Sequence, residues 1–146
     1  MRLILLTAAA LAVAACANAP MVDPARSAEI KKFEPKTDVA QIYVCRSNGI
    51  RGKHIRPEIV LDGKQQTAIS QGTFIYHEVS PGIHTLVART LDHDSIMPFG
   101  IEAGEKKFFQ TWISMESIPG QAIIEETNPT TGKDCVTHSE LVVTGY

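Results

Sequence analysis

The sequence contains no long amphipathic segment and no block dominated by glycine or proline. Its 10 glycines and 8 prolines are scattered between short segments that are rich in β-branched and aromatic residues. A helix of several turns would place apolar residues at i, i+3, i+4 and i+7, and no stretch of the chain keeps that spacing for long. We therefore expect little helix. The chain also has no internal repeat of fixed period, which argues against a repeat architecture.

An excess of positive charge is missing as well. The chain carries 14 Lys and Arg residues against 16 Asp and Glu residues, for a formal net charge of −2 at pH 7. Proteins that bind nucleic acid through its phosphates usually carry a strong basic excess. We therefore expect no nucleic-acid partner.

Motifs that mark common active sites are also absent. No serine lies in a G-x-S-x-G sequence, and residues 49–53 end in Gly-Lys without the spacing or the following Ser or Thr of a phosphate-binding loop. Glu125 and Glu126 are adjacent on an expected strand, so their carboxylates should face opposite sides. The sequence therefore predicts neither an enzyme nor a cofactor.

The histidines do not form a metal motif. None of the 5 histidines shows the H-x-H or H-x-x-x-H spacing that would place two zinc ligands on one element. We interpret the Asp-His-Asp sequence at residues 92–94 as a solvated turn, and we expect no metal. His84 follows a Ser-Pro-Gly turn at residues 80–82. We interpret it as a structural residue whose ring hydrogen-bonds that turn.

The N-terminal residues have the order of a secretory signal. Arg2 provides the positive charge, residues 3–15 are apolar, and the small residues Ala14 and Ala15 precede a cleavage site. A transmembrane helix needs about 20 apolar residues, so this run is too short to span a bilayer. One interpretation is an ordinary signal peptide, cut at Ala15 or Ala19, which would leave a soluble periplasmic protein.

The other interpretation depends on Cys16. The Val-Ala-Ala-Cys sequence that ends at Cys16 resembles the lipobox of bacterial lipoproteins. The resemblance implies that residues 1–15 are a lipoprotein signal peptide and that Cys16 becomes the acylated first residue of the mature protein, anchored to a membrane by its lipid. Cys16 is followed by Ala17 rather than Asp. By similarity to lipoprotein sorting, this favours the outer membrane, with the domain facing the periplasm.

The next segment is interpreted as a spacer. Residues 16–37 would form the lipidated N-terminus and a flexible linker, with a short helix at residues 27–33 that Pro35 stops. Fully extended, residues 17–37 would reach about 70 Å, and as a flexible coil they would average nearer 25 Å. The folded domain is expected to occupy residues 38–146.

Two cysteines remain if Cys16 carries a lipid. Cys45 and Cys135 then have only one possible pairing, which an oxidising compartment would favour. Their bond would close a loop of about 90 residues and stabilise the fold by roughly 4–5 kcal/mol through chain entropy. The alternatives are two free buried thiols or a redox pair, although a C-x-x-C sequence is absent.

From residue 38 onward, short β-rich runs alternate with turn signals. In residues 39–46, Ala, Ile and Val alternate with Gln, Tyr and Cys, so the two faces of this strand differ. The Asp-Gly pair at residues 62–63 and the Ser-Pro-Gly turn are typical strand connections. Residues 136–143 are expected to form the last strand. About seven to nine short strands at this spacing predict an all-β fold, a small antiparallel β-sandwich after the signal peptide and flexible linker.

Four segments carry a family resemblance. They are residues 39–46, residues 59–64 with their Asp-Gly end, residues 79–88 with a Pro-Gly-x-His hairpin, and residues 102–109 with a Gly-x-x-aromatic step. Together they resemble the bacterial, often lipoprotein, domain-of-unknown-function 2846 family, and they share turn markers with PEGA-like domains. The resemblance covers roughly residues 38–113 and implies a small β-sandwich. It implies no catalytic residue.

Basic residues cluster in the connection between the first two expected strands, with no acid among them. An exposed basic loop in a mildly acidic domain could hold an anion such as a lipid headgroup, a peptidoglycan carboxylate or an acidic protein surface. The alternative is a solvated loop that keeps a sheet edge soluble. The candidate residues are Arg46, Arg51, Lys53, His54 and Arg56.

A second candidate surface is aromatic. Phe108 and Trp112 should lie on one face of a strand and Phe109 on the other. One face should belong to the core, and the other would be a second packing layer or a binding patch.

These observations predict a non-enzymatic cell-envelope lipoprotein whose β-sandwich is an interaction domain of unknown specific role. Its expected partners are the membrane, through the N-terminal lipid, and another envelope protein or peptidoglycan. The alternative is a periplasmic module that binds a small anionic or glycan ligand through the basic loop at residues 46–56.

Overall fold

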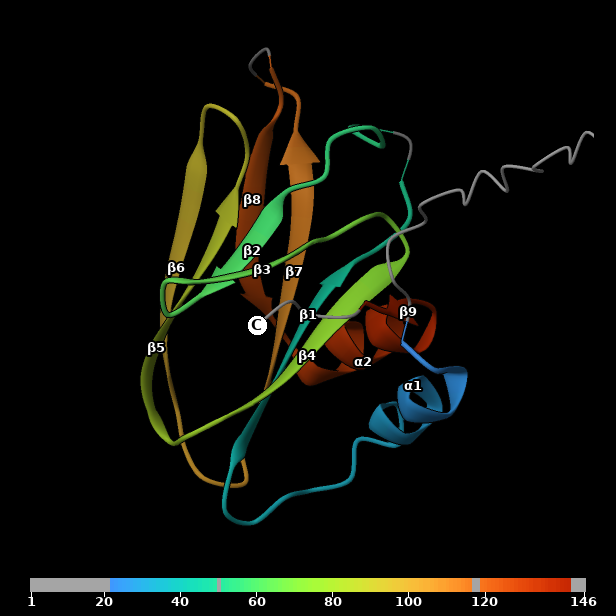
Figure 1. Cartoon of the computed structure of the whole chain (residues 1–146), viewed down its shortest axis with the longest axis vertical. Helices are drawn as coiled ribbons and strands as arrows, with labels where there is room; N and C mark the ends of the chain where they lie inside the picture. The colour runs from blue at the N-terminus through green and yellow to red at the C-terminus, as the bar shows by residue number, and fades with distance from the viewer. Residues whose placement is uncertain (1–21, 50, 117–118, 143–146) are drawn as a thin grey trace, which may run out of the picture.

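The computed structural model describes residues 22–49, 51–116 and 119–142, without the side chains of residues 65–67 (Figure 1). The predicted signal peptide and the predicted lipidation site at Cys16 lie outside these ranges. In chain order the elements are α1 (Pro24–Ile30), β1 (Ala40–Arg46), β2 (Glu58–Leu61), β3 (Lys64–Ala68), β4 (Thr73–Val79), β5 (Gly82–Arg89), β6 (Asp94–Ile101), β7 (Lys106–Ser114), β8 (Gln121–Thr127), α2 (Pro129–Thr137) and β9 (Glu140–Leu141).

The strands form two sheets that pack face to face. The first sheet has the order β8-β7-β1-β4-β9, and the second has the order β3-β2-β5-β6. The second sheet is antiparallel, but in the first sheet β1 runs parallel to β7 and β4 runs parallel to β9. The predicted β-rich, two-sheet architecture is confirmed, whereas the prediction of a wholly antiparallel sandwich is wrong. A parallel pair needs a long connection, and the path through the second sheet supplies one between β1 and β7.

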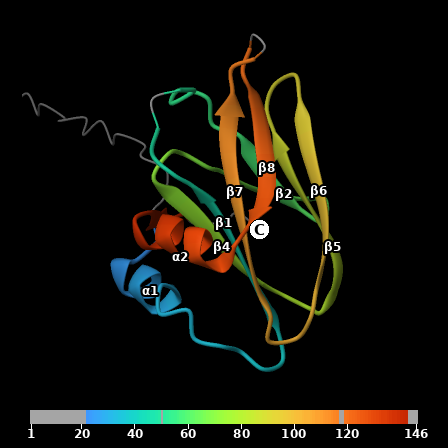
Figure 2. The same cartoon turned by 180° about the vertical axis from the view of Figure 1, so that it is seen from behind.

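β1 is the central strand of the first sheet, and all 7 of its residues are buried. Ala40, Ile42 and Val44 belong to the core between the sheets, whereas Tyr43 and Cys45 face the opposite side. This is the alternation that the sequence predicts. Both faces are buried because the second sheet covers one of them, and α1 and α2 cover the other (Figure 2).

The core between the sheets is mostly aliphatic, with two phenylalanines in contact. The ring centroids of Phe99 and Phe109 lie 4.8 Å apart, and Phe109 has no exposed surface. Burying one such side chain contributes on the order of 1.5–3 kcal/mol. The N–H of Ile124 in β8 donates to Ser95 Oγ in β6 at 3.2 Å. This bond joins one pair of sheet edges, so β3 and β4 border the other side of the sandwich.

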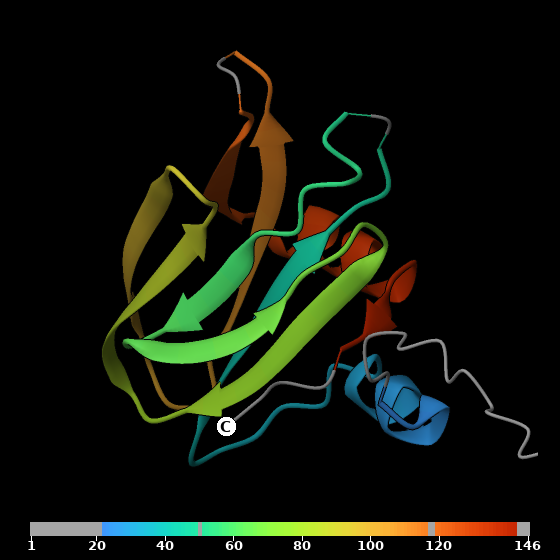
Figure 3. The ribbon, with the colours of Figure 1, turned by 45° about the horizontal axis from the view of Figure 1, so that its top comes forward.

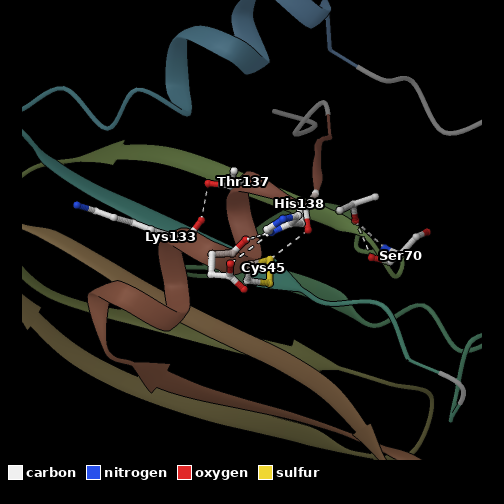
Figure 4. Close-up of a disulfide and its surroundings, with 9 residues drawn as sticks. Cys45, Ser70, Lys133, Thr137 and His138 are labelled. Atoms are coloured by element: carbon white, nitrogen blue, oxygen red, sulfur yellow. Dashed lines mark hydrogen bonds and ion pairs between the residues drawn. A yellow bond between two sulfur atoms is a disulfide. The ribbon is translucent and has the colours of Figure 1, made fainter.

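The two helices pack on an aromatic cluster of the first sheet. Tyr43 stacks on Phe108 with ring centroids 4.8 Å apart, and Phe33, which follows α1, lies 5.4 Å from Tyr43. A disulfide between Cys45 and Cys135 joins β1 to α2, with the Cα atoms 6.2 Å apart (Figure 4). The cysteine pairing expected from the sequence is present in the structure.

Part of the segment expected to be a flexible linker is a packed layer of the domain. Val22, Ile30 and Phe33 contact the aromatic cluster, and the Val22 N–H donates to the carbonyl of Leu141 at 3.3 Å. The linker prediction is therefore wrong from residue 22 onward. The apolar side chains of this segment bury surface against the sheet, which outweighs the chain entropy that a free linker would keep.

Both helices begin with the same local signal. Asp23 caps α1 and is followed by Pro24, and Asn128 caps α2 and is followed by Pro129. An Asx cap with proline at the first helical position is favourable because the cap accepts a free N–H and proline lacks one. The strand predicted at residues 136–143 is wrong over its first half. The end of α2 and the two-residue β9 lie there instead.

We predict that Gly132→Ala destabilises the protein although it lies in a helix. Alanine normally favours a helix over glycine by about 1 kcal/mol, but a Cβ at position 132 would overlap the Phe108 side chain beneath α2. The expected loss is roughly 1–3 kcal/mol in the free energy of unfolding, measured by urea titration with the disulfide intact. Gly100→Ala is the control, since nothing lies within 4 Å of its added Cβ. A more stable Gly132→Ala variant would contradict this packing.

Candidate functional site

Two clefts of similar size lie at different places on the sandwich. The loop-end cleft, about 490 Å³, lies beyond the ends of β1 and β7, where the β1–β2 connection comes close to the end of β7 (Figure 3). The side cleft, about 500 Å³, lies between the end of β4 and the β2–β3 turn. Of the basic and aromatic residues singled out from the sequence, Arg46, Arg51 and Trp112 meet at the loop-end cleft. The turn motifs meet at the side cleft.

Arg46 is the internal support of the loop-end cleft. It is only 2% exposed, and its guanidinium donates to three backbone carbonyls: from Nη1 to Ile55 at 2.6 Å and Ile69 at 3.3 Å, and from Nη2 to Gly52 at 2.8 Å. Burial lowers the pKa of Arg46. The sequence placed Arg46 in an exposed anion-binding loop, and the structure instead places it inside, where it holds the β1–β2 and β3–β4 connections together.

Two glycines let the loops come close to β7. Gly52 has a φ of +63°, and a Cβ on it would overlap the side chain of Ile113. Gly120 lies equally close to Ile113 and Met115. The side chain of Gln71 then donates from Nε2 to the carbonyl of Arg51 at 3.2 Å, which ties the β3–β4 connection to the β1–β2 connection. The rim of the cleft is therefore set by backbone geometry as well as by Arg46.

The remaining basic candidates do not converge on one point. Arg51, Lys53, His54 and Arg56 are all exposed, but only Arg51 lines the loop-end cleft. Lys53, His54 and Arg56 lie outside it on the same connection. The structure thus provides a basic surface around the cleft rather than a pocket of several cations.

The three aromatic candidates of β7 differ in their exposure. Phe108 and Phe109 are buried on opposite faces, as expected, whereas Trp112 is 41% exposed and lines the loop-end cleft. Met115, 47% exposed, lies beside it on the rim. Sequence reasoning treated the basic loop and the aromatic strand as separate candidates. Their meeting could not be read from the sequence, because it depends on the parallel pairing of β1 with β7.

The Asp-Gly and Pro-Gly-x-His motifs form one clamp at the side cleft. His84 contacts Asp62 Oδ2 through Nδ1 at 2.6 Å and the carbonyl of Ser80 through Nε2 at 2.8 Å. The N–H of Thr85 donates to Asp62 Oδ1 at 2.9 Å. The prediction that His84 is a structural residue bonded to its neighbouring turn is confirmed. Its second partner, Asp62 in the β2–β3 hairpin, was not foreseen. The hairpin expected at residues 79–88 is wrong, because β4 and β5 lie in different sheets and the turn connects the sheets.

The clamp favours its charged form. A carboxylate and a carbonyl can only accept, so both ring nitrogens of His84 must donate, and only the protonated ring can do this. Burial opposes the charge, but the bonds to Asp62 and Ser80 raise the pKa of His84 overall. Burial of Asp62 also opposes its charge, yet the bonds from His84 and Thr85 lower the pKa of Asp62. The two groups therefore stabilise each other as an ion pair.

Other ionisable groups of the side cleft lie on β4. Burial lowers the pKa of His77, and its Nε2 is buried without a hydrogen-bond partner among the described residues. Burial also raises the pKa of Tyr76 to about 12. The bond from Lys36 lowers the pKa of Glu78.

Among residues 22–49, 51–116 and 119–142, no group of three or more His, Cys, Asp or Glu residues could hold a metal ion. Within the same part of the chain, no helix is long and apolar enough to cross a bilayer.

The geometry defines a class of protein, a β-sandwich with one sheet covered by helices, a His-Asp clamp between the β2–β3 hairpin and the β4–β5 turn that connects the two sheets, and a cleft at one end. The chain belongs to the family described as protein of unknown function DUF2846, whose model matches residues 36–125. The match confirms the resemblance seen in the turn motifs, while α1 and α2 lie outside it. No curated protein and no solved structure matches the chain.

We predict that Arg46→Met lowers the free energy of unfolding by about 3 kcal/mol. The change keeps most of the side-chain volume but leaves the carbonyls of Gly52, Ile55 and Ile69 without their donor. Urea titration measures the loss. Arg56→Met, at an exposed position of the same connection, is the control and should change stability by no more than about 0.5 kcal/mol. Equal stability of the two variants would refute the supporting role of Arg46.

We also predict a pH dependence that comes from the clamp. Because the pKa of His84 is raised on folding, its contribution is complete below about pH 6.5 and is lost as the pH rises through the raised value. The difference in unfolding free energy between the native protein and His84→Gln should therefore stay constant below about pH 6.5 and shrink as the pH rises through the raised value. His54→Gln, at an exposed position, is the control. A difference that does not shrink at any pH above about 6.5 would mean that His84 is not charged in the clamp.

Proposed function

We propose that this protein is a non-enzymatic lipoprotein of the bacterial cell envelope. A lipid on Cys16 would hold the domain at a membrane. The favoured location is the outer membrane, with the domain facing the periplasm. The loop-end cleft would bind another envelope component. The lipid would determine the membrane at which the domain is held, and the loop-end cleft would make the contact with the partner.

The observation that carries this proposal is the exposure of Trp112 and Met115 on a fixed rim. Ile83, Leu91 and Ile96 are also exposed among the described residues, but they line neither of the two clefts. Trp112 and Met115, 41% and 47% exposed, lie together in one cleft. Exposed Trp residues next to Arg are typical anchors of binding surfaces. Arg46 and the loop glycines hold the rim in place, so binding would lose little conformational entropy.

The disulfide supports the expected compartment. Bonds such as Cys45–Cys135 persist in exported proteins and are rare in the reducing cytosol. This agrees with the signal sequence that precedes Cys16. The clamp at the other cleft has no hydroxyl or thiol nucleophile in its bonding network, since Ser80 takes part through its carbonyl. Its role is structural.

The second candidate is a module that binds a small anionic or glycan ligand in the same cleft. It is favoured by the amide side chains of Asn48 and Gln71, which line the cleft together with Arg51 and Trp112. Amides and a guanidinium suit a ligand with hydroxyl and carboxylate groups, and an indole face suits a sugar ring. The two candidates share one surface and differ in the size of what occupies it.

A photo-crosslinking residue at Met115 tests the first candidate in cells. We expect a specific crosslinked product from this position. A crosslinker at Ile83 should give none, because Ile83 is 87% exposed but lies at the opposite end of the sandwich, beside the start of β1. Cys16→Ala should release the protein from membranes and abolish the Met115 product.

Two results would count against the proposal. Equal crosslinking from Met115 and Ile83 would show that the loop end is not a preferred contact. Membrane association that survives Cys16→Ala would remove the lipid anchor from the mechanism.

A further inference from the structure

The loop end of the domain combines two kinds of exposed side chain. Trp112 and Met115 form an apolar pair, 41% and 47% exposed, on the rim of the cleft. Around them, the β1–β2 connection exposes the basic residues Arg51, Lys53, His54 and Arg56. Aromatic and basic side chains of this kind gather where a protein meets the headgroup layer of a membrane.

The chain enters the domain on the same side. The Val22 N–H donates to Leu141 in β9, and β9 pairs with Thr73 and Phe74 at the start of β4. Thr73 in turn lies opposite Arg46, where the β1–β2 connection leaves the sheet. The point of entry is therefore next to the strand ends that carry the loop end, and away from the β4–β5 turn at the other end.

The packing of α1 also shortens the tether. Residues 17–21 separate Cys16 from Val22, which is the first described residue and is bonded to the domain. At full extension this segment reaches about 20 Å. The linker expected from the sequence would have reached more than three times as far. A lipid on Cys16 would thus hold the loop end close to the membrane surface.

We propose that the loop end docks on anionic phospholipid headgroups of the membrane that carries the Cys16 lipid. The basic residues contact the phosphates, and Trp112 and Met115 enter the interfacial layer. This inference rests on the lipid anchor of the proposed function and names the contact made by the loop-end cleft. It gives the tethered domain a fixed orientation, with the β4–β5 turn and the side cleft facing away from the bilayer.

The distribution of charge favours a lipid surface over a single small ligand. A compact anion is usually bound by cations that converge. Among the described residues that line the cleft, Arg51 is the single exposed cation, because Arg46 is buried and engaged with backbone carbonyls, and Glu116 adds a negative charge. Lys53, His54 and Arg56 are spread along the connection outside it. A surface of many mobile headgroups can satisfy such a spread of charges, and each basic residue adds to the attraction.

Trp112 provides a direct test, because it is the single tryptophan of the chain. The lipidated full-length mature protein is reconstituted into vesicles of phosphatidylcholine alone or mixed with phosphatidylglycerol, each containing brominated acyl chains. We expect a blue shift and bromine quenching of the Trp112 emission in the mixed vesicles. Both should weaken at about 1 M salt, where the Debye length falls to about 3 Å.

A charge-matched pair of variants locates the contact. Arg51→Gln with Lys53→Gln should lower the ratio of docked to undocked protein about 30-fold, as expected for two cations near an anionic surface. Lys36→Gln with Lys106→Gln removes the same charge near the start of β1 and should leave the ratio unchanged. Equal effects of the two pairs would overturn the assignment to the loop end.

The remaining outcomes separate the docking from the anchor. Vesicle association without quenching in either lipid would overturn the docking and leave the lipid anchor in place. Equal quenching in both lipids would overturn the anionic contact. Failure to associate with either vesicle would overturn the anchor and the docking together. A protein crosslinked at Met115 in cells, combined with unquenched Trp112, would assign the loop end to a protein partner instead.

Discussion

The burial of β1 on both faces is the constraint on which the rest of the structure depends. One face needs the second sheet, and the other needs the two helices, so neither layer is optional. The buried polar side chains of this strand also need partners away from water. The amide of Gln41 donates to the hydroxyl of Tyr76 at 3.1 Å, although Gln41 Oε1 has no partner among the described residues, and the guanidinium of Arg46 donates to the loop carbonyls. Burial raises the pKa of the neighbouring Tyr43, which keeps its hydroxyl neutral.

The two ends of the sandwich are shaped by different polar devices. At the end of β1, the buried Arg46 draws two connections over the edge of the core. At the opposite end, Asp62 and His84 join the β2–β3 hairpin to the β4–β5 turn, which connects the two sheets, and part of the pair remains in contact with solvent. The charge of Arg46 is buried, so water cannot replace its hydrogen bonds. The Asp62–His84 pair is partly exposed, so its protonation can change with pH. The sheets between them are apolar, so each end can be adjusted without disturbing the other.

The sequence predicts the strands of this fold more accurately than it predicts how the sheets and helices are layered. The alternation in β1, the turn at Asp62 and the structural role of His84 all follow from local rules, because period and turn chemistry are encoded over a few residues. The Asp-Pro and Asn-Pro pairs that begin α1 and α2 are also local signals. They were not recognised as helix starts, because α1 is short and α2 contains β-branched residues. The inward turn of Arg46 and the meeting of Arg51 with Trp112 depend on pairing between distant strands. No pattern within a short window specifies such contacts.

The position of β1 also has a consequence for how the chain acquires its structure. As the first strand to be synthesised, β1 emerges before either of its neighbours, and it must wait for β4 on one side and β7 on the other. Cys135, which forms the disulfide with Cys45 of β1, is synthesised later still. Until then, a strand that is apolar on both faces has two unpaired edges, a form prone to aggregation. The covering of β1 is thus completed only by α2, and a chain released before α2 would leave the aromatic cluster around Tyr43 and Phe108 exposed.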